Sequence, residues 1–160
     1  MPSAYIETTI PSYYVARTSL NLLQASRQAS TRIWWDSGCS GFELFTSLEA
    51  IEEAQEGDAE MALQRLALLH KATHLDITDE VGTLAQGLVA GGLIPSKAAS
   101  DAILIAVASV HKMNYLVTWN FKHIANPFLR DRLRKAVQEA GFQLPVLCSP
   151  DELLQYNEDN

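Results

Sequence analysis

The stretch that decides the fold is "SDAILIAVASVHKMNYLVTWN", residues 100–120, in which a long apolar segment is followed at once by a shorter one. The first segment, residues 101–111, is apolar around nearly its whole circumference, which is typical of a helix buried inside a protein. The second segment, residues 115–118, is a short apolar run typical of a strand that is covered on both faces. A buried helix leading into a buried strand is the repeating unit of an α/β fold.

The same alternation continues in both directions along the chain. Strands are expected at Ala4–Glu7, Phe42–Thr46, His74–Ile77, Tyr115–Thr118 and Leu144–Leu147. Helices are expected at roughly Leu20–Asp36, Leu48–Gln55, Ala59–Lys71, Glu80–Ala90, Asp101–His111 and Phe128–Ala140. Strands that alternate with helices form right-handed βα units, which make a sheet mainly parallel. We therefore expect an α/β fold, a three-layer α/β/α sandwich with a mainly parallel sheet of four or five strands.

Composition points to one soluble domain. The chain has 160 residues without a repeat or linker, so residues 1–160 are expected to form a single domain. Apolar residues make up 48% and charged residues 19%, as in ordinary folded proteins. No apolar run approaches the roughly 20 residues that span a bilayer, and no secretory signal is visible. Cys39 and Cys148 stand alone, which suits a reducing compartment, so we expect a cytoplasmic protein without membrane contact.

The formal net charge of -7 excludes a broad electrostatic surface for nucleic acid, because phosphate binding depends on clustered Lys and Arg. Contact with RNA or DNA must then be local, or a metal ion must supply the positive charge. Alternatively, a basic partner covers the acidic surface.

Polar side chains gather where the expected strands end. Glu7 ends the first strand, and Asn120 follows the strand at residues 115–118. Asp101 opens the buried helix, while Glu52 and Glu53 lie on the helix after the second strand. In open parallel sheets, ligands bind beyond the carboxyl ends of the strands. Four segments of the chain are thus expected to bring these side chains to one edge of the sheet.

Each of these side chains also has an ordinary structural interpretation. Asp101 suits a helix N-terminus, although Ser100 could already cap that helix. Asn120 suits a turn, and the acidic run that includes Glu52 and Glu53 suits a solvated helix face. Glu7 is the hardest to explain structurally, because a strand that enters a buried layer seldom ends in an unpaired acid.

Other common catalytic motifs are absent from the sequence. It contains no GxxxxGK[ST] phosphate loop, no GxGxxG dinucleotide fingerprint and no GxSxG nucleophile turn. His70 and His74 are four residues apart but lack the intervening Glu of a zinc protease, so we expect them on the surface.

The frame "YIETTIPSYY … SLEAIEEAQEGD … SDAILIAVASVHKMNYLVTWNFKHIANP … SPDELL" resembles the PIN domain family, in its VapC-like branch of small prokaryotic ribonucleases. The resemblance covers nearly the whole chain, and "SDAILIAVA" with the following strand and "TWNFKHI" is its most specific part. It implies a PIN-like fold and a Mg²⁺- or Mn²⁺-dependent endoribonuclease that hydrolyses RNA phosphodiesters. It also implies the toxin of a toxin–antitoxin pair, an antitoxin partner and a homodimer. The alternative is a PIN-like binding module with weak or no nuclease activity.

Carried over residue by residue, the resemblance assigns catalytic roles to Glu7, Glu53, Asp101 and Asn120, of which the first three would bind the metal ion. Helical periodicity alone leaves both Glu52 and Glu53 possible, and the family's E-x-x-x-G-D ending favours Glu53. The family usually has Asp at the positions of Glu7 and Asn120. The neutral Asn120 removes one charge, which favours a single metal ion over two.

Several neighbours of these residues are expected to support the site. Thr8 and Thr118 supply hydroxyls that would orient the metal ligands or a bound water. Lys122 and His123 follow the strand end closely and are candidate phosphate contacts. Two further groups have open roles, namely Arg130 with Arg134, which suit a solvated helix face, and Trp34 with Trp35, which suit either base stacking or the core.

Overall fold

All five strands of the computed structural model belong to one sheet. The structure describes the backbone of residues 1–158 and the side chains of residues 1–154. The strand order is β3-β2-β1-β4-β5, and every neighbouring pair is parallel. The strands are β1 (Ser3–Ile6), β2 (Glu43–Ser47), β3 (Thr73–Leu75), β4 (Tyr115–Val117) and β5 (Val146–Cys148). The predicted α/β sandwich with a parallel sheet of four or five strands is therefore confirmed, and the sheet has five strands. The last two residues of the predicted 1–160 domain lie outside the described part.

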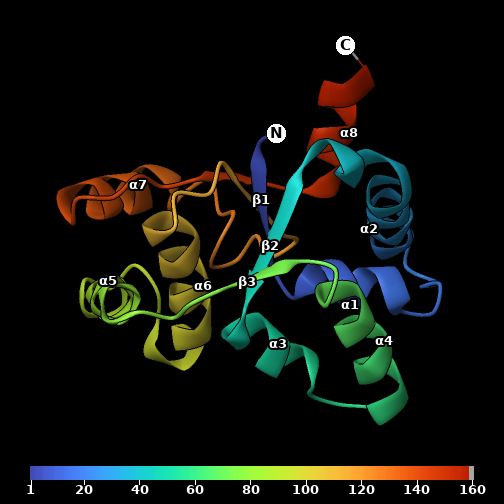
Figure 1. Ribbon diagram of the computed structural model, residues 1–160, viewed down its shortest axis with the longest axis horizontal. Helices are drawn as coiled ribbons and strands as arrows, with labels where there is room; N and C mark the ends of the chain where they lie inside the picture. Colours follow the sequence, from blue (N-terminus) through green and yellow to red (C-terminus); the bar gives the residue numbers. More distant parts are fainter. Residues whose placement is uncertain (159–160) are drawn as a thin grey trace.

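Helices cover both faces of this sheet (Figure 1). Helices α5, α6 and α7 lie on one side, and α1, α2 and α4 lie on the other, so the molecule has three layers. The α-helices are α1 (Thr9–Val15), α2 (Leu22–Ile33), α3 (Leu48–Ala54), α4 (Ala59–Leu69), α5 (Asp79–Ala90), α6 (Ala99–Val110), α7 (Arg130–Glu139) and α8 (Pro150–Glu158).

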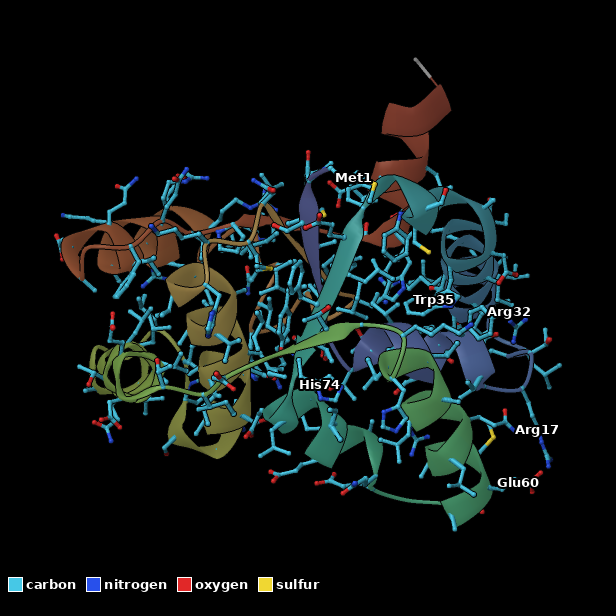
Figure 2. All side chains as sticks on the ribbon, in the orientation of Figure 1. Met1, Arg17, Arg32, Trp35, Glu60 and His74 are labelled. Carbon is cyan, nitrogen blue, oxygen red and sulfur yellow. The ribbon has the colours of Figure 1, made fainter. Side chains whose placement is uncertain are left out.

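The alternation of side chains along β1 produces one hydrophobic core on each face of the sheet. Successive side chains of a strand point to opposite faces. Tyr5 therefore packs into the core beneath α5, α6 and α7, whereas Ala4 and Ile6 pack into the other core, which includes Trp34 and Trp35. Trp34 and Trp35 are thus core residues, and Figure 2 shows Trp35 between β2 and α2. Base stacking by this pair is excluded by their burial.

Helix α6 is the buried helix that the sequence predicts. Every residue from Leu104 to Ser109 is buried, on an element that runs into β4. A helix with apolar side chains all round is stable only where neighbours cover it on every side, as they do here. No helix in the described part of the chain combines the length and apolarity needed to cross a membrane.

Two short helices differ from the sequence prediction. Residues 8–12 predict a turn that leads into a helix, whereas α1 already begins at Thr9, with Pro11 in its first turn. Proline is tolerated there, because the missing N–H would have no partner within the helix. Helix α8, which begins at Pro150, was likewise not predicted. The predicted helix at 20–36 ends at Ile33 and continues as a π-helical turn over Trp34–Gly38.

Candidate active site

The sheet reverses its direction of growth at β1, which creates a crevice at its carboxyl edge. From β1 the chain adds β2 and β3 on one side and then returns to add β4 on the other. Ligand sites of open α/β sheets lie at such a point. Glu7 follows β1, and its backbone N–H donates to the carbonyl of Val117 at the end of β4, across 3.2 Å. Glu7 and Thr118 thus leave neighbouring strands side by side.

The side chain of Glu7 is buried, with 2% of its surface exposed, and its hydrogen bonds meet at one oxygen. The Oε2 atom accepts from the backbone N–H of Thr9 at 3.0 Å and from the hydroxyl of Thr118 at 2.8 Å. The hydroxyl of Thr9 also donates to this oxygen. Three donors on two segments therefore fix the orientation of the carboxylate.

The two threonine hydroxyls are themselves fixed by the segment after β4. The N–H of Trp119 donates to Thr9 Oγ1 at 2.8 Å, and the N–H of Asn120 donates to Thr118 Oγ1 at 2.9 Å. A hydroxyl that accepts from a backbone N–H keeps its own hydrogen for another acceptor. Two parallel relays thus run from backbone N–H groups to Glu7.

Burial raises the pKa of Glu7 to about 7, because the charged form loses its hydration. The hydroxyl hydrogen bonds oppose this shift, and the nearby charge of Glu53 adds to it. The single salt bridge among the described residues joins Arg134 to Asp131, so no cationic side chain of this part neutralises Glu7. A bound cation would offset the free-energy cost of burying the charged carboxylate of Glu7.

Glu53 is held by hydroxyls from two other elements. Its Oε2 atom accepts from Thr8 Oγ1 at 2.7 Å, and its Oε1 atom accepts from the hydroxyl of Ser100. Glu52 is exposed and makes none of these contacts. Helical periodicity leaves both residues possible, and Glu53 is the one that is hydrogen-bonded to Thr8, after β1, and to Ser100, in the first turn of α6.

Asp101 lies in the first turn of α6 and is half-buried. Burial raises its pKa, the charge of Glu53 raises it further, and Asn120 and His123 lower it. Helix α6 begins at Ala99 without a side-chain cap, so the alternative that Ser100 caps it is wrong. Ser100 instead lies inside the first turn, where its hydroxyl reaches Glu53.

These side chains line one open cavity of about 540 Å³ at the carboxyl edge of the sheet. Its polar character comes from carboxylates, hydroxyls and one amide, without a basic residue. The lining residues are Glu7, Thr8, Thr9, Ser12, Glu49, Glu52, Glu53, Glu56, Ser100, Asp101 and Asn120. The four predicted catalytic residues therefore meet in one place, together with Thr8; Thr118 lies directly beneath, bonded to Glu7.

Glu49 and Glu56 are lining residues that the sequence interpretation missed. Together with Glu52 or Glu53 they are spaced three or four residues apart along α3 and its end, so they share one helix face. This spacing was visible in the sequence, but an acidic face is so often merely solvated that it did not stand out.

The predicted phosphate contacts lie outside the cavity lining. Lys122 is exposed, and His123 is half-buried, with its backbone N–H donating to Asn120 Oδ1 at 3.0 Å. Only the effect of His123 on the pKa of Asp101 links this pair to the acidic residues. His70 and His74 are both exposed, as predicted.

The donor set suits a hard divalent cation. Carboxylate and amide oxygens are the ligands that Mg²⁺ and Mn²⁺ take in proteins. Within the described part of the chain, no group of three or more His, Cys, Asp or Glu side chains already stands in a metal-binding arrangement. The hydroxyls of Thr8 and Ser100 each donate to one oxygen of Glu53, which leaves a second lone pair on each oxygen for a metal ion.

Comparison with known proteins gives a match at the level of structure alone. No protein-family model matches the chain. No curated protein matches it either. A chain of a crystal structure, that of VapBC2 from Rickettsia felis bound to a DNA fragment from their promoter, superposes with a TM-score of 0.58. The two chains share one fold. The match covers 91% of this chain and 97% of that chain at 17% sequence identity.

Proposed function

We propose that the protein is a metal-dependent endoribonuclease that hydrolyses RNA phosphodiester bonds, and the toxin of a cytoplasmic toxin–antitoxin pair. The observation that carries the proposal is that Glu7, Glu53 and Asp101 come from three separate segments and line one cavity at the carboxyl edge of the sheet. The fold shared with a chain of the VapBC2 structure supports the toxin assignment.

Glu7, Glu53 and Asp101 would hold a Mg²⁺ or Mn²⁺ ion, with the Asn120 amide beside them. Such an ion, when bound, lowers the pKa of a coordinated water and stabilises charge on the phosphate. The chain itself orients the ligands: Thr9 and Thr118 hold Glu7 through Oε2, and Thr8 holds Glu53. Lys122 and His123 remain proposed contacts for more distant phosphates.

Cleavage assays test this function directly. Labelled single-stranded and structured RNAs are incubated with the protein in Mg²⁺, in Mn²⁺ and in EDTA. We expect cleavage with either metal ion and none in EDTA. No cleavage by correctly folded protein at any metal concentration would contradict the proposal.

The second candidate is a PIN-like binding module with weak or no nuclease activity. One observation in its favour is that Asn120, the fourth of the predicted catalytic residues, is neutral. The other is that the carboxylates of the described residues form no group of three or more in a metal-binding arrangement. Under this alternative the protein acts through a protein partner, and RNA is cleaved weakly or not at all.

Partner proteins are part of either proposal. Leu22 and Leu23 at the start of α2 are exposed, as are Ile33 at its end and Leu20 just before it. Exposed apolar side chains that gather on one element favour contact with another protein, here an antitoxin or a second copy of the chain. Light scattering after size-exclusion chromatography gives the mass of the purified protein and tests the homodimer.

A further inference from the structure

The guanidinium group of Arg27, on α2, is stacked against two aromatic rings. Its Cζ atom lies 5.4 Å from the ring centroid of Trp119 and 5.1 Å from that of Phe121. These distances are typical of cation–π contacts, in which a cation lies over the face of an aromatic ring. Trp119 and Phe121 in turn meet edge to face, with centroids 5.9 Å apart.

This stacking holds the charge of Arg27 in place without using its N–H donors. In the described part of the chain its guanidinium makes neither a hydrogen bond nor a salt bridge. Arg32 and Arg65 differ, because their guanidinium groups donate to backbone carbonyls and are thereby committed to the fold. Arg27 keeps five donors for an external acceptor.

Hydrogen bonds also tie Arg27 to the acidic cavity through Trp119. The indole N–H of Trp119 donates to Thr31 Oγ1 at 2.8 Å, and that hydroxyl donates to the carbonyl of Arg27 at 2.6 Å. The backbone N–H of Trp119 donates to Thr9 Oγ1, whose hydroxyl donates to Glu7. These bonds connect the backbone of Arg27 to Glu7 through Trp119.

The surroundings of Arg27 suit a nucleotide strand. Phe121 and Tyr13 are half-buried, and each adjoins a residue that lines the cavity, Asn120 and Ser12 respectively. The cavity lining carries six carboxylates and no basic residue, so it repels phosphate. Arg27 lies over the ring of Phe121, the neighbour of cavity-lining Asn120, and a cation beside partly accessible aromatic rings is an arrangement on which unpaired nucleotides bind.

We propose that Arg27 binds a phosphate of single-stranded RNA next to the acidic cavity, and that Phe121 stacks with the adjoining base. This inference rests on the proposed ribonuclease function for its substrate. Single strands are favoured over duplexes because only unpaired bases can leave their own stack to meet the ring of Phe121.

The test compares the parent with Arg27→Ala, Arg27→Lys and a matched control, Arg132→Ala, on the exposed face of α7. Binding of a short labelled single-stranded RNA is followed by fluorescence anisotropy with Ca²⁺, and gels verify that the RNA stays intact. We expect Arg27→Ala to weaken binding about tenfold and to reduce the salt slope by about 0.7. Arg27→Lys should keep the salt slope of the parent but bind RNA several-fold more weakly, since the ammonium group of lysine is not planar and cannot stack on the rings. Arg132→Ala binds like the parent.

Cleavage kinetics separate this inference from the proposed function. With Mg²⁺ or Mn²⁺, Arg27→Ala should raise KM about tenfold with kcat largely retained. RNA binding that depends on Arg27 without any cleavage would uphold the inference and contradict the ribonuclease. Cleavage with unchanged KM and salt slope in Arg27→Ala would overturn the inference alone.

A purely structural role for Arg27 gives a different result. A lower melting temperature for Arg27→Ala with unchanged RNA affinity would overturn the inference, because the stacking would then serve only the fold. If Arg27→Ala does not fold, Phe121→Leu replaces it, and we expect this variant to lose affinity for single strands but not for duplex RNA. Equal losses for both RNAs would contradict base stacking.

Discussion

The hydroxyl of Thr118, at the end of β4, donates to Oε2 of Glu7, at the end of β1, across 2.8 Å. The two residues are 111 positions apart in the chain, and pairing of the two strands brings them together. Because Thr118 Oγ1 accepts the N–H of Asn120, its hydrogen is directed at Glu7. Together with the N–H and the hydroxyl of Thr9, this hydroxyl holds the buried carboxylate in one orientation.

Thr118→Val removes this hydroxyl while keeping the shape of the side chain. If Glu7 binds a metal ion, loss of its orienting partner should reduce metal affinity or cleavage roughly 10- to 100-fold. Thr46→Val is the control, because Thr46 is also buried in the sheet but donates to the backbone carbonyl of Ile6. Both variants should lose about 1–3 kcal/mol of stability, and only Thr118→Val should lose activity. Equal activities would contradict the orienting role.

Glu7→Gln should stabilise the metal-free protein above neutral pH. The pKa of Glu7 is about 7 in the folded state and ordinarily 4.5, so between these pH values the folded chain binds more protons than the unfolded chain. Stability therefore falls as pH rises through this window. This difference between the two pKa values corresponds to a loss of about 3 kcal/mol in the free energy of unfolding.

Urea unfolding in EDTA at pH 5 and pH 8 measures this effect. The variant should be the more stable protein at pH 8, and its advantage should nearly vanish at pH 5. An advantage of the same size at both pH values would show that the carboxyl does not titrate in the window, and that packing explains the change.

The fold and the edge that carries the site could be predicted from the sequence because both depend on local patterns. Apolar strands alternate with helices, and the apolar helix at 101–110 is buried as its composition predicts. Once a parallel sheet is expected, Glu7 and Asn120 follow strands whose carboxyl ends share an edge.

The hydrogen bonds within the site could not be predicted, because they join residues far apart in the chain. Ser100 looks like a helix cap in the sequence, yet it donates to Glu53 from inside the first turn. Arg27 is one of many residues on a polar helix, and only the fold places Trp119 and Phe121 beneath it. The sequence alone could not show that Glu49 and Glu56 line the cavity, because this depends on how α3 is oriented in the fold.

Glu53→Gln and Glu52→Gln form a matched pair on α3. Glu53 is held by Thr8 and Ser100, whereas Glu52 is exposed at the rim of the same cavity. We expect Glu53→Gln to reduce cleavage by orders of magnitude and Glu52→Gln to change it less than threefold. The reverse ranking in RNA cleavage assays would assign the metal-binding role to Glu52.

Asp101→Asn separates metal binding from a helix-terminal role. The variant keeps a polar side chain in the first turn of α6 but removes its charge, so stability in EDTA should equal or slightly exceed that of the parent, since repulsion by Glu53 is lost. Cleavage should fall by orders of magnitude. Asp79→Asn is the control, because Asp79 lies in the first turn of α5, away from the acidic cavity. Full cleavage activity in Asp101→Asn would contradict its catalytic role.

Divalent metal should raise the melting temperature of the protein. An ion that binds only the folded state adds about 2.7 kcal/mol to the free energy of unfolding when its concentration is a hundredfold above its Kd. The stabilisation should be larger here at pH 8 than at pH 5, because a metal ion competes with protons for Glu7, whose pKa burial raises to about 7.

Melting curves with EDTA and with millimolar Mn²⁺ measure this stabilisation, and Asp101→Asn distinguishes its site. The midpoint of the parent should rise with Mn²⁺, and that of the variant should rise less, since one ligand of the cluster has lost its charge. Asp79→Asn should respond like the parent. Equal shifts in all three proteins would place the ion elsewhere on an acidic surface, and identical midpoints with and without Mn²⁺ would mean that the carboxylates of Glu7, Glu53 and Asp101 hold no metal ion.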